Sequence, residues 1–128
     1  MYDKINKKDN KQKGCEKTMN YIVLDLEATC EKDDMSYPKE IIEIGAVKLN
    51  DKLEIISEFN AFVKPIQKPI LTDFCKELTS ISQEDIDNAQ CFINVAFDFK
   101  RWIGDDYVLL SWGHYDKNQL IKDCNLNK

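Results

Sequence analysis

The stretch that decides the fold is YIVLDLEATC, residues 21–30, where an apolar run leads into two acidic residues. The run Tyr21–Leu26 is short and apolar, as is typical of a buried β-strand. Side chains two apart on a strand point to the same face, so Asp25 and Glu27 are expected side by side. Two such carboxylates repel each other unless a cation lies between them. Hard oxygen ligands of this kind suit Mg²⁺ or Mn²⁺.

Two more strands are predicted directly after this one. Ile41–Leu49 is apolar on both faces except for Glu43 and Lys48, which indicates a strand covered on both sides. Leu53–Val63 alternates, which indicates an edge strand with one wet face. The apolar positions expected on its buried face are Leu53, Ile55, Phe59, Ala61 and Val63. Because the connections are short, the three strands are expected to form an antiparallel meander.

The second half of the sequence favours helices with one further strand. The capping-box spacing of Ser82 and Asp85 marks the start of one helix. Gly104 is placed to end a later helix, Phe92–Ile103. A strand reached through helices is most simply parallel to a strand already in the sheet. The order βββ-α-α-β-α therefore predicts an α/β fold with mixed strand directions. The remaining predicted elements are helices at Thr72–Leu78, Phe92–Ile103 and about Tyr115–Asp123, and a strand at Tyr107–Ser111.

A third carboxylate, Asp116, follows the last predicted strand in the segment SWGHYD, residues 111–116. If that strand lies beside Tyr21–Leu26, Asp116 comes near Asp25, since adjacent strands are only about 4.8 Å apart. Three carboxylates are enough to begin a two-metal site for phosphodiester hydrolysis. Each motif also has a simpler interpretation when taken singly. Asp25 would cap a turn, Glu27 would be solvated, and Asp116 would be a helix N-cap.

Length, composition and charge indicate which classes of protein this chain can belong to. The 128 residues, 43% hydrophobic and 32% charged, fit one domain. No apolar run approaches a membrane span and no signal peptide is visible, so we expect a cytoplasmic protein without membrane association. The net charge of −5 disfavours general polyanion binding, so contact with nucleic acid would need local basic groups or bound cations. Residues 1–18 are expected to be a disordered Lys/Asn-rich tail, with Met19 a candidate translation start.

Four motifs in this order resemble the DEDDh 3′–5′ exonuclease family, and within it the histone-mRNA and small-RNA exonuclease subgroup. They are DLEATC at 25–30, IIEIGAV at 41–47, LTSIS at 78–82 and SWGHYDKNQL at 111–120. The resemblance implies an RNase H-like mixed β-sheet flanked by helices, in an exonuclease domain at residues 19–128. It also implies metal-dependent hydrolysis at the 3′ end of RNA or single-stranded DNA.

The resemblance assigns roles to individual residues. Asp25, Glu27 and Asp116 would be the catalytic ligands of two Mg²⁺ or Mn²⁺ ions. Trp112 would stack on a base, although a core position is an equally simple interpretation. The other implied substrate contacts are the backbone around Leu26, Ala28 and Thr29, and the residues Thr79 and Ile81.

Departures from the family pattern are as important as the matches. The family's fourth acid and general-base histidine lie in a C-terminal motif that has no counterpart here, and His114 belongs to the third-acid motif instead. We therefore expect this chain to be the N-terminal two-thirds of the domain, to lack the last strand and helix, and to be poorly active by itself. A complementing C-terminal fragment, or a second copy at the open sheet edge, is the expected protein partner. The alternative is a non-catalytic nucleic-acid-binding or interaction module. Ser80 stands where the subgroup often has Gly.

Overall fold

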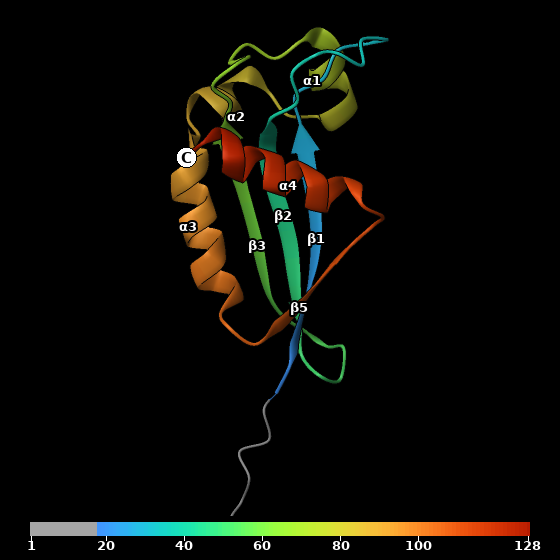
Figure 1. Ribbon diagram of the computed structural model, residues 1–128, viewed down its shortest axis with the longest axis vertical. Helices are drawn as coiled ribbons and strands as arrows, with labels where there is room; N and C mark the ends of the chain where they lie inside the picture. Colours follow the sequence, from blue (N-terminus) through green and yellow to red (C-terminus); the bar gives the residue numbers. More distant parts are fainter. Residues whose placement is uncertain (1–17) are drawn as a thin grey trace, which may run out of the picture.

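The computed structural model describes residues 18–128, which form a curved sheet with helices packed around it (Figure 1). The sheet order is β4-β3-β2-β1-β5, with β1–β2 and β2–β3 antiparallel and β1–β5 and β3–β4 parallel. The mixed α/β sheet predicted from the sequence is therefore confirmed. The elements are β1 (Asn20–Ala28), β2 (Ile41–Leu49), β3 (Ile55–Lys64), α1 (Asp73–Thr79), α2 (Gln83–Asp87), β4 (Gln90–Cys91), α3 (Phe92–Ile103), β5 (Tyr107–Ser111) and α4 (Tyr115–Leu126).

The strand β5 lies beside β1, as the site prediction required. Its parallel register pairs Val23 with Leu110 and Leu24 with Ser111. The chain leaves β5 at Ser111 and enters α4 after the short connection 112–114, and α4 contacts β1. The two-residue strand β4 was not predicted, since so short a segment carries no periodicity.

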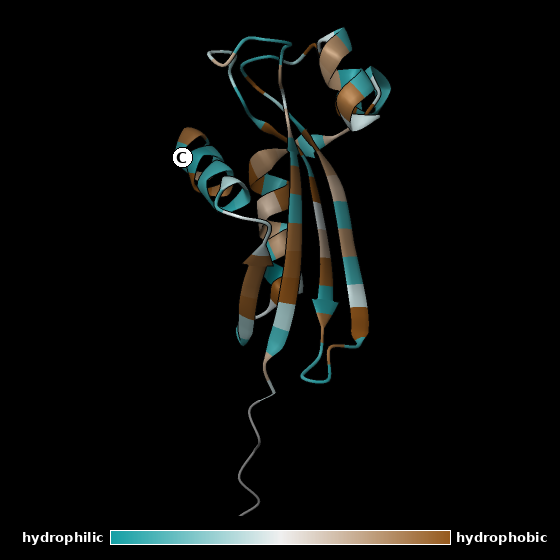
Figure 2. Ribbon diagram, turned by 90° about the vertical axis from the view of Figure 1, so that its right-hand side faces the viewer, coloured by the Kyte–Doolittle hydropathy of each residue, from teal (hydrophilic) through white to brown (hydrophobic). Residues whose placement is uncertain are grey.

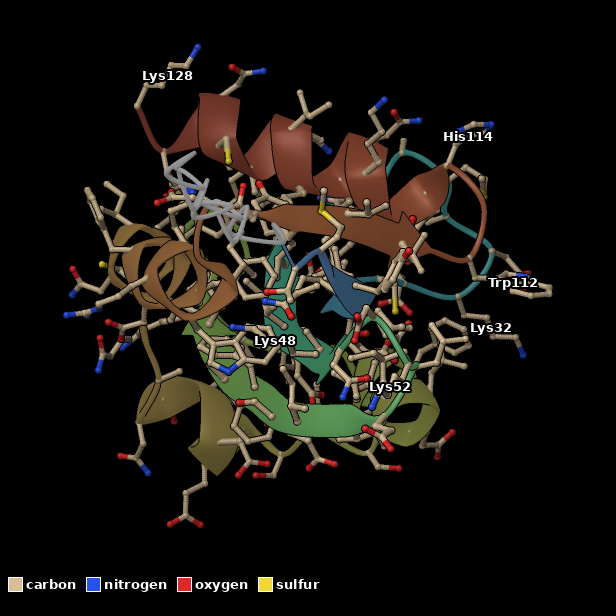
Figure 3. The ribbon with its side chains drawn as sticks, turned by 90° about the horizontal axis from the view of Figure 1, so that it is seen from below. Lys32, Lys48, Lys52, Trp112, His114 and Lys128 are labelled. Carbon is tan, nitrogen blue, oxygen red and sulfur yellow. The ribbon has the colours of Figure 1, made fainter. Side chains whose placement is uncertain are left out.

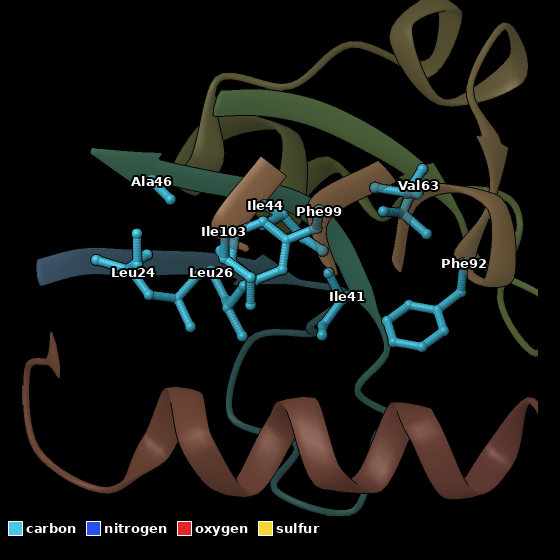
Figure 4. Close-up of a cluster of buried hydrophobic side chains, with 11 residues drawn as sticks. Leu24, Leu26, Ile41, Ile44, Ala46, Val63, Phe92, Phe99 and Ile103 are labelled. Carbon is cyan, nitrogen blue, oxygen red and sulfur yellow. The ribbon is translucent and has the colours of Figure 1, made fainter. Parts of the chain in front are cut away.

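Residues on the two faces of β1 differ sharply in burial. Ile22, Leu24 and Leu26 are at most 5% exposed and pack into the main core, where they meet side chains from α3 (Figure 4). Val23 is 42% exposed on the other face, which also carries Asp25. Both longer helices, α3 and α4, lie on the same side of the sheet in Figure 2. Among residues 18–128, no helix covers the opposite face of β1–β3 over most of its length (Figure 2).

The helix α3 follows its sequence pattern closely. Phe92, Val95, Phe99 and Ile103 are all buried, at the i, i+3, i+7 and i+11 spacing of one helical face. Gly104 follows with a φ of 78°, a conformation that favours glycine. The predicted helix and its stop are therefore confirmed.

The start of β3 corrects one prediction. Leu53 and Ile55, expected on the buried face, are 65% and 63% exposed. Leu53 has a φ of 62° and belongs to a turn whose backbone is held by Asn50, which accepts from the N–H groups of Lys52 and Glu54 through its side chain. The strand begins only after this turn, because the side chain of Asn50 competes with the ladder hydrogen bonds.

A second, smaller core lies under α1 and α2. It contains Ile42, Leu71, Cys75, Ile81 and Ile86, all nearly inaccessible to solvent. The hydrogen-bonded capping box between Ser82 and Asp85 is present as predicted. Thr72 is the N-cap of α1 rather than its first residue.

In residues 18–128 no helix is long and apolar enough to cross a membrane. The predicted disordered tail falls, apart from Thr18, outside the described residues.

Candidate active site

Three acidic side chains come together where β1 meets α4. Asp25 and Glu27 lie on one face of β1, as their spacing predicted. Asp116 lies in the first turn of α4 and is only 5% exposed. The N-cap of α4 is His114, so the simpler interpretation of Asp116 as an N-cap is wrong. Its carboxylate lies near enough to the backbone N–H of Leu26 on β1 for that group to lower its pKa.

Mutual repulsion marks these carboxylates as a group. Burial raises the pKa of Asp116, the negative charge of Asp25 raises it further, and the Leu26 N–H partly offsets both. Burial also raises the pKa of Glu27, followed by the charges of Asp25, Glu43 and Asp116. Glu43 sits directly opposite Glu27 in the β1–β2 register. A divalent cation bound among these groups would remove the repulsion.

The donor set fits a hard divalent cation in its chemistry, because it offers only carboxylate oxygens. Asp25, Glu27 and Asp116 are the residues that would hold it. In the part of the chain that the structure describes, however, no three His, Cys, Asp or Glu side chains are grouped closely enough to form a ready-made metal site. The structure thus brings the three acids within electrostatic reach of one another without assembling them into a coordination shell.

Glu43 on β2 is hydrogen-bonded to the neighbouring strand β3. Its Oε1 atom accepts a hydrogen bond of 2.6 Å from Asn60 Nδ2 on β3. The two side chains lie on the open face of the sheet, beside a shallow groove that also contains Asp25 and Gly45. A Cβ atom added at Gly45 would lie 3.7 Å from the carbonyl oxygen of Asp25, which is ordinary contact.

The end of β1 is fixed through its backbone and through Thr29. The Thr29 hydroxyl donates to the carbonyl of Pro38 at 2.7 Å and accepts from the N–H of Glu40 at 2.9 Å. The Thr29 N–H donates to the carbonyl of Glu40 at 2.8 Å. The side chains of Leu26, Ala28 and Thr29 are all buried. The backbone contact to a substrate that the sequence suggested for this segment stays a prediction.

The other predicted substrate contacts lie in two different settings. Thr79 Oγ1 donates to the Cys75 carbonyl at 2.7 Å and accepts from the Ile81 N–H at 3.2 Å, so its hydroxyl shapes its own loop. Ile81 is 3% exposed and belongs to the second core. Trp112 is 96% exposed, so its interpretation as a core residue is wrong. Figure 3 shows Trp112 and His114 projecting outward from the loop and helix end that follow β5.

Two buried acids near the site were missed by the sequence analysis. Glu40 is 2% exposed and accepts from the N–H groups of Ile66 at 2.9 Å and Gln67 at 2.5 Å. Asp123 is also 2% exposed, on the buried side of α4. No local pattern marks either residue. The one available signal for Glu40 was its place immediately before an apolar strand.

Comparison with known proteins identifies the family. The family model for RNase T, described as "Exonuclease", matches residues 22–125. This chain belongs to the exonuclease family. Among its relatives, ERI1 exoribonuclease 2 of Xenopus laevis is 45% identical over 83 residues, covering 64% of this chain and 12% of that protein. ERI1 exoribonuclease 3 of Homo sapiens is 40% identical over 90 residues, covering 70% of this chain and 26% of that protein. The chain therefore spans about an eighth to a quarter of those relatives' length.

Comparison with solved structures places the chain more closely within the family. The nuclease domain of 3′hExo, a DEDDh family member bound to rAMP, is 35% identical with a TM-score of 0.80, over 84% of this chain and 59% of that one. A 3′-exonuclease that recognises the 3′ end of the histone mRNA stem-loop is 34% identical with a TM-score of 0.77, over 84% of this chain and 52% of that one. These matches confirm the RNase H-like fold and the resemblance to the DEDDh exonucleases of the histone-mRNA type.

Proposed function

We propose that this chain carries the metal-binding part of a 3′–5′ exonuclease, which hydrolyses phosphodiester bonds at the 3′ end of RNA or single-stranded DNA. The observation that carries the proposal is the meeting of Asp25 and Glu27 on β1 with the buried Asp116 on α4. The exoribonuclease names of the relatives favour RNA as the substrate class.

Each part of the site has a task in this proposal. Asp25, Glu27 and Asp116 would hold Mg²⁺ or Mn²⁺, which supplies an activated water and stabilises charge on the phosphate. The backbone from Leu26 to Thr29, with the loop at Thr79 and Ile81, orients the terminal nucleotide. The fully exposed Trp112 offers an aromatic face on which an unpaired base can stack.

Low activity of the isolated chain is part of the proposal. The side chain of His114 projects away from the sheet at the start of α4, so it is badly placed to take a proton from water at the carboxylates (Figure 3). General-base assistance is commonly worth about 10²–10⁴-fold in rate. A non-catalytic nucleic-acid-binding module is the second candidate, favoured by the lack of a ready-made metal cluster within residues 18–128.

A protein partner is proposed for the uncovered part of the sheet. Val108 and Leu110 on β5 are 39% and 43% exposed and lie next to Val23 on the open face. The outer edge of β5 has no pairing strand among the described residues. Exposed edges and apolar patches of this kind favour association. A complementing C-terminal fragment or a second copy would cover them.

The test is cleavage of a 5′-labelled RNA with a 3′ overhang in Mn²⁺, comparing the unaltered chain with Asp25→Asn. Asp51→Asn is the matched control, because Asp51 is an exposed acid in the distant β2–β3 turn. Stepwise shortening from the 3′ end that only Asp25→Asn abolishes would support the exonuclease. Metal-dependent binding of the RNA without cleavage would favour the binding module. Absence of both Mn²⁺ binding and RNA binding in a folded sample would contradict the proposal.

A further inference from the structure

The helix α4 is docked on the sheet mainly by polar side chains. Its buried residues are Asp116, Gln119 and Asp123, which share one face of the helix at i, i+3 and i+7. A docked helix normally buries an apolar stripe. On α4, by contrast, Ile121 and Leu126 are 51% and 38% exposed, and only the partly buried Leu120 reaches the main core.

Gln119 and Asp123 form a closed set of hydrogen bonds with the start of β2. Asp123 Oδ1 accepts from the Ile41 N–H at 3.1 Å, and Asp123 Oδ2 accepts from Gln119 Nε2 at 2.6 Å. Gln119 Nε2 also donates to the carbonyl of Lys39 at 2.9 Å. Asp123 and Gln119 are 2% and 5% exposed, so water does not compete for these bonds.

The same short segment, residues 38–41, also holds the acidic end of β1. Thr29 bonds to the carbonyl of Pro38 and to both backbone groups of Glu40. The side chain of Glu40 in turn fixes the backbone at residues 66–67. Segment 38–41 is therefore a common anchor for the strand that carries Asp25 and Glu27 and for the helix that carries Asp116.

We infer that Asp123 and Gln119 are positioning residues, which fix α4 to segment 38–41 and thereby hold Asp116 opposite Asp25 and Glu27. Asp123 lies seven residues beyond Asp116, about 10 Å along the helix axis, so it acts on the site through the helix and not by direct contact. The inference rests on the proposed function, because the quantity that the pair controls is the geometry of the proposed metal ligands.

The test measures Mn²⁺ binding by the full 128-residue chain, using Asp123→Ala and Gln119→Ala, at a temperature where circular dichroism shows every variant folded. Loss of a residue that orients metal ligands typically weakens metal binding by roughly 10–100-fold. We expect a loss of that size for Asp123→Ala and a smaller one for Gln119→Ala. The two losses should not add in the double variant, because both residues belong to one network.

Two controls separate positioning from general stability. Asn125→Ala changes an exposed position on α4 and should leave Mn²⁺ affinity within twofold, an allowance of about 0.4 kcal/mol. Val95→Ala opens a cavity in the core at α3, so it should lower stability without changing the affinity of the folded protein. If Asp123→Ala fails to fold, Asp123→Asn takes its place, since it keeps an acceptor for the Ile41 N–H and loses the one for Gln119.

A metal-free readout completes the test. Hydrogen exchange of Asp123→Ala should show faster exchange in α4 and unchanged protection in α3. Unchanged Mn²⁺ affinity in Asp123→Ala, with binding still abolished by Asp25→Asn, would overturn this inference and leave the proposed function intact. Absence of Mn²⁺ binding by the unaltered folded chain would overturn the proposed function, and this inference with it.

Discussion

Replacing Thr29 with valine should destabilise the protein strongly although the side chain keeps its shape. The Thr29 hydroxyl makes two hydrogen bonds at a position that is 2% exposed, donating to Pro38 and accepting from Glu40. Valine removes both bonds and leaves the buried N–H of Glu40 and the part-buried carbonyl of Pro38 without that partner. Each group left unsatisfied costs about 1–3 kcal/mol. Two fully buried groups would give about 2–6 kcal/mol, and the Pro38 carbonyl is only part-buried. We therefore expect a loss of about 2–4 kcal/mol in the free energy of unfolding, a large share of the roughly 5–15 kcal/mol typical of a domain.

Urea unfolding followed by circular dichroism measures this loss. With a slope of about 2 kcal/mol per M, the midpoint should fall by about 1–2 M. Thr29→Ser is the matched control, because it keeps the hydroxyl and removes one methyl group, worth about 1 kcal/mol. Equal stability of Thr29→Val and the unaltered chain would refute the reasoning, since it would mean that these buried bonds contribute nothing. A larger loss in Thr29→Ser than in Thr29→Val would refute it as well.

Three further predictions concern the loop, the carboxylates and the exposed tryptophan. Ser80→Gly should stabilise the chain by about 0.5–1 kcal/mol in urea unfolding, because Ser80 ends α1 with a φ of 61°, where glycine avoids the strain of a side chain. The pKa of Glu27 is raised in the folded state, so without metal the folded protein binds a proton at Glu27 more strongly than the unfolded chain does. The folded protein therefore loses stability as pH rises from the ordinary pKa of 4.5 through the raised one. Glu27→Gln should therefore have a higher metal-free Tm than the unaltered chain at pH 7, an advantage that thermal scans should show disappearing as pH falls toward the ordinary value of 4.5. Trp112→Ala should leave stability within about 0.5 kcal/mol, since the ring is 96% exposed, yet lower affinity for single-stranded RNA about tenfold in a filter-binding titration. An unchanged affinity would remove Trp112 from the proposed site.

Local sequence patterns were enough to predict much of the fold and the direction of its key side chains. Strand periodicity placed Asp25 and Glu27 on one face of β1, and the apolar stripe of α3 and Gly104 defined that helix. The rule for strands reached through helices gave the parallel direction of β5. These features depend on short-range geometry, because neighbouring residues along a strand or helix have fixed relative directions whatever the rest of the chain does.

Local patterns did not predict which polar residues are buried and which apolar residues are exposed, because this depends on how the elements pack. Asp116 has the sequence context of an N-cap, yet it is buried because α4 lies against β1. Asp123 is buried by a bond to Ile41, 82 residues away in the sequence. Trp112 is a large apolar residue of the kind found in cores, and it is exposed because nothing among the described residues packs against its ring. Burial is a property of contacts between distant segments, and so local patterns predicted the elements while the packing of α4 on the sheet determined the site.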